Sequence, residues 1–215
     1  KSLEDPLGFT TFYTYDGRGN LLTETDALGF ITTYTYNDLN QVETIEDALG
    51  FITTNRYDEF GNLREREDAQ GNITEYDYFP DGTLKTVTDA EDNETSYVYD
   101  DLGRVEDLTD ATGAVTKFTY DDIGNVKTIT TPLNYKTTFD YDEQGRLTQV
   151  TDAKGNKAQI RYNAAGEREE VIDALDRSTT YTYNNRGLIE TTHYPDDTSE
   201  TFLYDAKDQR VGIID

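Results

Sequence analysis

The sequence predicts an all-β protein built from about ten tandem β-hairpin repeats of 21 residues each. Three observations predict it: a tyrosine recurs at a fixed step, strand-length stretches alternate apolar with polar residues, and turn residues separate those stretches. Sheets of more than about ten strands usually curl, close or split. We therefore expect a continuous spiralling sheet, a β-solenoid that forms a tube or shell.

The repeat is defined by its tyrosines, for which we predict a structural ladder, each ring packing against the repeats before and after it. The turn glycine follows four residues later, replaced in two repeats by Asn40 and Asp208. The ladder consists of Tyr15, Tyr36, Tyr57, Tyr78, Tyr99, Tyr120, Tyr141, Tyr162, Tyr183 and Tyr204. The turn glycines are Gly19, Gly61, Gly82, Gly103, Gly124, Gly145, Gly166 and Gly187.

The first strand of each repeat is the stretch that ends at the ladder tyrosine. In residues 30–36, Phe30, Thr32, Tyr34 and Tyr36 fall on one side, and across the repeats the alternate positions are mostly polar. A period of two indicates a strand with one packed face. The segment Tyr-Asp-x-x-Gly that follows, as in residues 99–103, indicates a hairpin turn, because Asp can bond its own backbone and Gly can take a positive φ.

The second strand has a different pattern. In residues 125–130 the apolar side chains are Val126 and Ile129, three positions apart. This step breaks strict alternation, so it predicts a bulge or a strong twist in the strand. A second turn, as in residues 26–29 (Asp-Ala-Leu-Gly), then links each hairpin to the next.

These repeated strings resemble those of the RHS, or YD-repeat, family. Residues 99–105 and 141–147 follow the family pattern Y-D-x-x-G-R-L or nearly so, while Phe79 replaces the Asp in one turn and Arg168 replaces an aliphatic. The resemblance implies a hollow, spiralling β-shell in a secreted or cell-surface protein. In bacterial members of the family the shell often encloses a toxin domain, and in animal relatives it belongs to an adhesion ectodomain.

The resemblance covers residues 1–215, which we take as a single repeat array and as a fragment of a larger protein. The function expected is structural: the wall of a shell, tube or filament without catalysis of its own. The constant 21-residue step favours a straight tube or filament, because it gives a constant rise and rotation per repeat. The expected partners are neighbouring repeats of the same parent chain, identical subunits, or an encapsulated toxin domain.

Charge and composition exclude several other classes. The formal charge is −25, from 44 acidic and 19 basic residues, so the surface repels phosphate backbones and anionic lipid heads. We expect neither nucleic-acid binding nor membrane insertion. Cysteine is absent, which excludes disulfides and thiolate chemistry.

Candidate chemistry is sparse. His193 is the only histidine, so a catalytic triad has almost no candidate, and we expect no enzyme. Paired carboxylates such as Asp100 and Asp101 fall in turns, which favours turn formation over glycosidase chemistry. We expect no cofactor. Ca²⁺ is the secondary candidate, at the linking-turn carboxylates Asp26, Asp47, Asp68 and Asp110. The alternative function is an adhesion or carbohydrate-binding module that uses the aromatic ladder.

Overall fold

The structure is a computed structural model that describes residues 1–215, and it contains 21 β-strands and no helix. It confirms the all-β hairpin-repeat fold. The chain divides into two compact segments, residues 1–114 and 115–215. The structure contains no helix of the length and apolar character needed to cross a membrane.

The strands follow the predicted period throughout. In the N-terminal segment they are β1 (Ser2–Glu4), β2 (Thr10–Tyr15), β3 (Leu21–Thr25), β4 (Ile31–Tyr36), β5 (Val42–Glu46), β6 (Ile52–Tyr57), β7 (Leu63–Glu67), β8 (Ile73–Tyr78), β9 (Leu84–Thr88), β10 (Glu94–Tyr99) and β11 (Val105–Thr109). In the C-terminal segment they are β12 (Val115–Tyr120), β13 (Val126–Thr130), β14 (Lys136–Tyr141), β15 (Leu147–Thr151), β16 (Lys157–Tyr162), β17 (Arg168–Ile172), β18 (Ser178–Tyr183), β19 (Ile189–His193), β20 (Ser199–Tyr204) and β21 (Arg210–Ile214).

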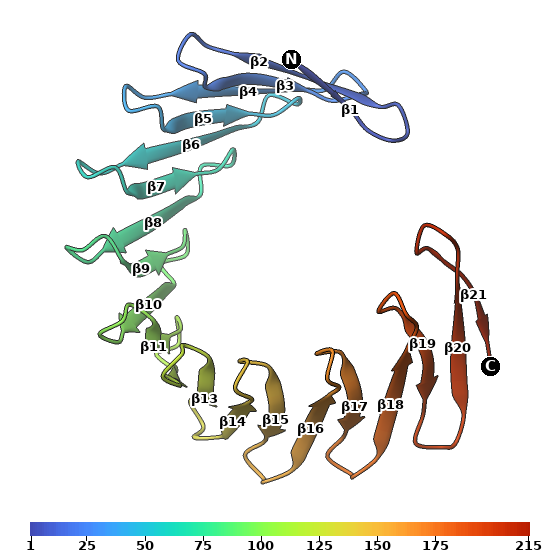
Figure 1. The fold of residues 1–215 in the computed structure, drawn as a ribbon. Coiled ribbons are helices and arrows are strands. Elements are labelled where there is room, and N and C mark those ends of the chain that lie inside the picture. The colour runs from blue at the N-terminus through green and yellow to red at the C-terminus, as the bar shows by residue number, and fades with distance from the viewer. The chain divides into compact units, whose positions relative to one another are not determined.

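Within each segment, every strand pairs antiparallel with the strands before and after it, so the chain forms a simple meander (Figure 1). The turn after each ladder tyrosine therefore lies at one edge of the sheet, which we call the hairpin-turn edge. The turn that leads into the next repeat lies at the opposite edge, which we call the linking-turn edge.

The second strand of each repeat carries the predicted bulge. In β4–β5, Thr35 pairs with Thr44 and Tyr36 pairs with Val42, so Glu43 is one residue too many on β5. The same shift recurs in the other hairpins, for example between Thr119 and Tyr120. The extra residue restores the alternation, since it brings aliphatic side chains three positions apart to the same face.

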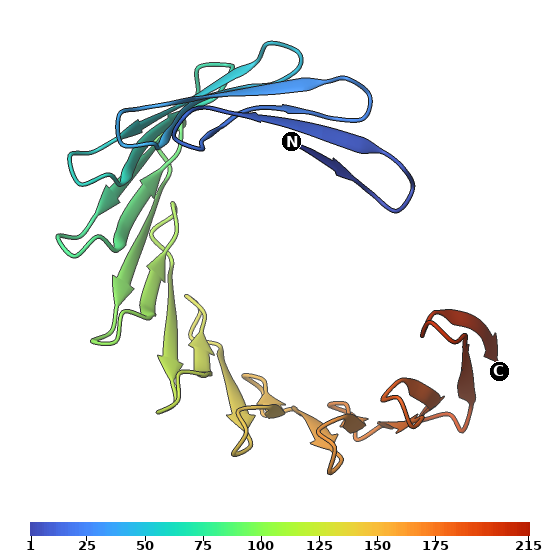
Figure 2. The same ribbon diagram turned by 45° about the horizontal axis from the view of Figure 1, so that its top comes forward.

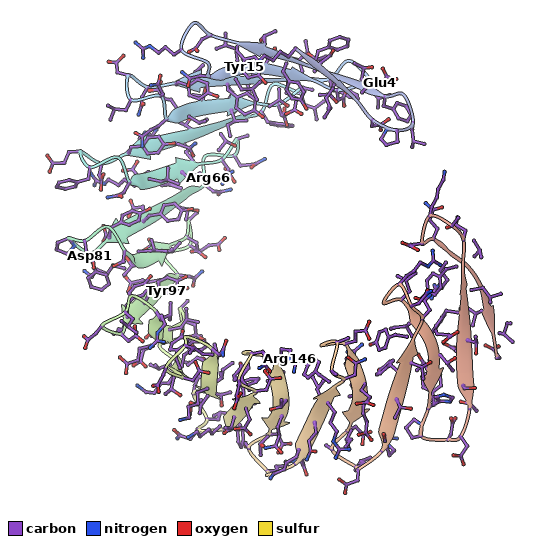
Figure 3. All side chains as sticks on the ribbon, viewed as in Figure 1. Glu4, Tyr15, Arg66, Asp81, Tyr97 and Arg146 are labelled. Carbon is purple, nitrogen blue, oxygen red and sulfur yellow. The ribbon has the colours of Figure 1, made fainter.

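The sheet consequently has two different faces. On the aromatic face, Tyr34 pairs with Ile45 and Tyr36 with Val42. On the opposite face, which we call the threonine face, Thr35 pairs with Thr44 and their hydroxyl oxygens lie 2.6 Å apart. Side chains stand on both sides of the ribbon (Figure 3), and a second view shows strands in a single layer in each segment (Figure 2).

A single layer leaves the protein without a buried apolar core. No hydrophobic side chain is fully buried, and the least exposed residues are Thr128 and Thr192, at 7% and 6%. The packed face expected from the sequence is therefore only half-buried. Stability has to come mainly from the backbone hydrogen bonds between paired strands and from side-chain contacts between neighbouring repeats.

Candidate functional site: the tyrosine ladder and its turns

The ladder tyrosines join each repeat to the one before it. The hydroxyl of Tyr99 donates a 2.7 Å hydrogen bond to the carbonyl oxygen of Leu84, fifteen residues earlier. Leu84 begins the second strand of the preceding repeat, directly before its bulge. The bond thus crosses from one 21-residue repeat to its neighbour. The same bond is made by Tyr36, Tyr57, Tyr78, Tyr141, Tyr162, Tyr183 and Tyr204.

Most of the ladder rings are half-buried on the aromatic face, whereas Tyr15 is 42% exposed. Burial raises the pKa of the phenol of Tyr57, and burial followed by the nearby Tyr97 and Asp81 raises that of Tyr99. These hydroxyls therefore stay protonated and able to donate at neutral pH. The acceptors of these two hydroxyls are the backbone carbonyls of Val42 and Leu84.

Other side chains cover the rings from the side. The rings of Tyr97 and Tyr99 are stacked, with centroids 6.5 Å apart. The guanidinium of Arg146, labelled in Figure 3, lies 4.4 Å from the ring centroid of Tyr162 in the next repeat. Such cation–π contacts are worth about 0.5–1 kcal/mol at exposed sites. The arginine of the Gly-Arg-Leu string in one repeat thus makes a cation–π contact with the ladder tyrosine of the next repeat.

The hairpin turn is closed by its first aspartate. The backbone N–H of Asp100 donates to the carbonyl of Arg104 at 2.9 Å, and Gly103 donates to the carbonyl of Asp100 at 2.9 Å. Oδ1 of Asp100 accepts from the backbone N–H groups of Leu102 and Arg104, while Oδ2 accepts from the Arg104 side chain. One carboxylate thereby satisfies three donors in the turn.

The linking turn has the same geometry. Gly71 donates to the carbonyl of Asp68, whose Oδ1 accepts from the backbone of Gln70 and Asn72. Oδ2 of Asp68 accepts from the side-chain amide of Asn72 at 2.8 Å. This side-chain bond, followed by the backbone bond from Asn72, lowers the pKa of Asp68. The hairpin turn and the linking turn therefore use the same aspartate-centred hydrogen bonds at opposite edges of the sheet.

The fourth turn residue adopts a left-handed conformation. Gly103 has φ of 75°, and where glycine is replaced, Asn40 and Asp208 have φ of 61° and 64°. Asn and Asp are the side chains that best tolerate this region, because they bond locally to the backbone. The two exceptions in the sequence pattern thus preserve the turn.

Neighbouring hairpin turns also contact each other, which the sequence reasoning missed. The side-chain amide of Asn20 donates to Oδ1 of Asn40 at 3.0 Å, and that of Gln41 donates to the carbonyl of Gly61 at 2.6 Å. Arg186 forms an ion pair with Asp208 in the following turn. The signal that could have revealed the first two bonds is the residue after the fourth turn position, which is polar in nine of the ten repeats, Leu188 being the exception.

The structure contains no group of three or more His, Cys, Asp or Glu side chains positioned to hold a metal ion. The calcium candidates lie one per linking turn and use Oδ1 for turn hydrogen bonds. They are Asp26, Asp47, Asp68 and Asp110. His193 is exposed at the end of β19, where it pairs with Ser199.

One hairpin turn departs from the pattern and forms a hollow. Phe79 replaces the turn aspartate and packs edge-on against Tyr99, with ring centroids 6.2 Å apart. A surface hollow lies between this turn and the next, lined by Phe79, Val98 and Tyr99 together with Asp81 and Asp101.

The repeats match a known family model. The RHS Repeat model matches residues 1–31, 15–52, 80–115, 100–132, 120–157 and 162–199, which together cover more than half of the chain. The chain belongs to the RHS repeat family. No curated protein matches the sequence.

Solved structures share the fold of these RHS repeats. A crystal structure of TcdB2-TccC3 is 19% identical over 94% of this chain, with a TM-score of 0.61. Another, of TcdB2-TccC3-TEV, is 20% identical with a TM-score of 0.64, and the Tc holotoxin pore of Photorhabdus luminescens is 19% identical with a TM-score of 0.63, each over 94% of this chain. The chain spans 13% of the length of each of these relatives. At this identity the likeness concerns the fold.

Proposed function

We propose that this RHS array is a wall segment of a secreted or cell-surface β-shell, tube or filament, with no catalysis of its own. The observation that carries the proposal is the inter-repeat bond from Tyr99 to Leu84 and its seven counterparts. The tyrosine that recurs every 21 residues, the most regular feature of the sequence, therefore serves to hold neighbouring repeats together.

The architecture supports the same reading. A single layer without a buried core encloses nothing within itself, but it separates two sides that differ in chemistry. One side carries the tyrosine and aliphatic rows, and the other carries threonine pairs such as Thr119 and Thr128. A wall is a structure of this kind, and a catalytic domain normally needs a concave pocket with convergent polar groups.

The fold match to the Tc toxin proteins supports a parent chain much longer than this array. In that parent, the expected partners are further RHS repeats, identical subunits or a protein domain held inside the shell. The test is electron microscopy of the longest natural chain that carries the array. A hollow particle or a thread with a single-layer wall is expected, whereas a solid globular particle would contradict the proposal.

Carbohydrate binding is the second candidate, favoured by the hollow at Phe79. Half-buried aromatic rings beside carboxylates such as Asp81 are suited to stacking and hydrogen bonding with a sugar ring. Calorimetry with a panel of oligosaccharides tests this function. Phe79→Asp is the control variant, because the neighbouring repeats have aspartate at the same turn position, as Asp58 and Asp100. Binding that Phe79→Asp abolishes would support this function.

A further inference from the structure

Three successive linking turns in the N-terminal segment expose large apolar side chains. Leu7, Leu28 and Leu49 occupy the third position of the turn and are 82%, 79% and 77% exposed. The aromatic residue that ends each turn is also more than half exposed, as the values for Phe9, Phe30 and Phe51 show (57%, 54% and 51%). We call these six residues the apolar edge.

The turn itself does not require these side chains. The next linking turn has Gln70 and Asn72 at the same positions, and the Asn72 amide donates to Oδ2 of Asp68 at 2.8 Å. In the turn of Leu28 and Phe30, Asp26 makes only the Oδ1 bonds to the backbone. The apolar version thus forgoes a hydrogen bond and exposes hydrophobic surface. Six such side chains expose roughly several hundred Å², a size typical of interaction sites.

The charge around the apolar edge selects its partner. The three linking turns and the strand ends that lead into them carry Glu4, Asp5, Glu24, Asp26, Glu46 and Asp47, and residues 19–55 contain no basic residue. A second copy of this chain, an acidic protein or an anionic lipid surface would be repelled here. A basic partner would gain both apolar contact and charge complementarity.

The spacing of the turns selects the partner's conformation. Consecutive linking turns are two strands apart, about 9.6 Å. Residues seven apart on an α-helix lie on nearly the same face and about 10.5 Å apart. An extended strand laid along this edge covers the step in about three residues, which places successive contacts on opposite faces. A helix of about 14 residues spans all three turns.

We propose that the apolar edge is a docking surface for a basic amphipathic helix of another protein, whose apolar residues recur every seven positions. Its leucine-type side chains would pack between Leu7, Leu28 and Leu49 and the aromatic residues beside them. Its lysines or arginines would face Glu24, Asp26, Glu46 and Asp47.

The test uses the 215-residue chain and a synthetic 21-residue peptide with leucine at two positions of each heptad and lysine and alanine elsewhere. Binding is measured by fluorescence anisotropy at 150 mM NaCl. The test variant carries Leu28→Gln, Phe30→Asn, Leu49→Gln and Phe51→Asn, which copy the chain's own turn at Gln70 and Asn72. These changes leave the net charge unaltered, so they separate apolar docking from general attraction to an acidic protein.

We expect the dissociation constant to rise at least tenfold in the variant while the circular dichroism spectrum stays the same. The matched control carries Leu133→Gln and Tyr135→Asn, the same chemistry at an isolated turn of the C-terminal segment, and should bind like the unaltered chain. A peptide of the same composition with shuffled leucines should bind at least tenfold more weakly.

Three results would overturn the proposal. The first is equal affinity of the unaltered chain and the four-residue variant. The second is equal affinity for the ordered and the shuffled peptide. The third is self-association of the unaltered chain in sedimentation equilibrium that the variant loses, which would assign the apolar edge to a second copy.

Discussion

Tyr99 reaches across the boundary between two repeats and donates its hydroxyl proton to the carbonyl oxygen of Leu84, 2.7 Å away. Leu84 stands beside the bulge of its own repeat and pairs with Tyr78, the previous tyrosine of the ladder. Tyr99 is therefore both a strand partner within its repeat and a hydrogen-bond donor to the repeat before it, as are seven other ladder tyrosines. The ladder couples folding of one hairpin to the presence of the last.

Removing this hydroxyl should weaken the array. Tyr99→Phe is expected to cost about 1 kcal/mol, the usual net worth of one hydrogen bond. Tyr99→Ala is expected to cost about 2 kcal/mol, less than a fully buried aromatic would, because the ring is half-buried. Urea unfolding followed by circular dichroism measures both.

Tyr15→Phe is the control for the hydroxyl, because Tyr15 is not among the ladder tyrosines that donate to a preceding repeat in this structure. It should change the free energy of unfolding by less than about 0.5 kcal/mol. Equal costs at Tyr15 and Tyr99 would show that the inter-repeat bond adds nothing.

Turn glycines should be hard to replace. Gly103→Val places a β-branched residue at φ of 75° and should cost about 1–3 kcal/mol. Gly103→Asn should cost less, since Asn40 already adopts φ of 61° at the equivalent position. Gly17→Val should be nearly neutral, because a Cβ there meets nothing within 4 Å and the backbone is not left-handed. Thermal melts of the three variants test the order.

The two adjacent carboxylates Asp100 and Asp101 should behave differently. Asp100 accepts three hydrogen bonds that close its turn, whereas Asp101 is exposed and bears no such role. We expect Asp100→Ala to lower the melting temperature and Asp101→Ala to leave it unchanged or raise it slightly, since it removes one charge from a protein of charge −25. The opposite order would refute the assignment of Asp100 to turn closure.

Acid should destabilise the array. The hydrogen bonds from Asn72 lower the pKa of Asp68, and those from Arg104 lower the pKa of Asp100, below the ordinary value of 3.8. A carboxyl with a lowered folded-state pKa contributes stability that is present above its unfolded pKa and lost as the pH falls through the folded one. Melting temperatures should hold from pH 7 to about 5 and fall below about 4.

Relief of charge repulsion acts in the other direction, because protonation reduces the net charge of −25. A melting temperature that rises steadily down to pH 3 would mean that repulsion outweighs the turn carboxylates. The double variant Asp68→Ala, Asp100→Ala should lose less stability in acid than the unaltered chain, since two of the titrating groups are gone.

Calcium should act only as a general counter-ion. Each linking-turn carboxylate, such as Asp26, already gives Oδ1 to backbone donors, and tight Ca²⁺ sites need six to eight oxygens. We expect 5 mM CaCl₂ and NaCl of matched ionic strength to raise the melting temperature equally. A larger rise with Ca²⁺, lost in Asp26→Asn, would establish a site.

The sequence alone predicted the hairpin period, both turns and the bulge, because each depends on local chemistry repeated ten times. The three-residue step from Val126 to Ile129 predicted a bulge or a strong twist in this strand, and the structure has a bulge there. Partners across repeats were harder to predict: the acceptor of Tyr99 depends on the register between hairpins, and the bond from Asn20 to Asn40 depends on the distance between turns. The sequence also overstated burial, since aromatic content does not tell whether a second layer covers the rings.

Side-chain hydrogen bonds between repeats reach about one repeat along the chain, as the 22 residues between Arg18 and Asn40 show. A break anywhere in the array therefore severs the same few bonds, and rejoining the ends one full period later restores them. Duplication or deletion of gene segments in steps of 63 nucleotides would add or remove whole repeats. The repeats on either side of the new junction would still make the same contacts. Its length can thus drift over generations while its cross-section stays constant.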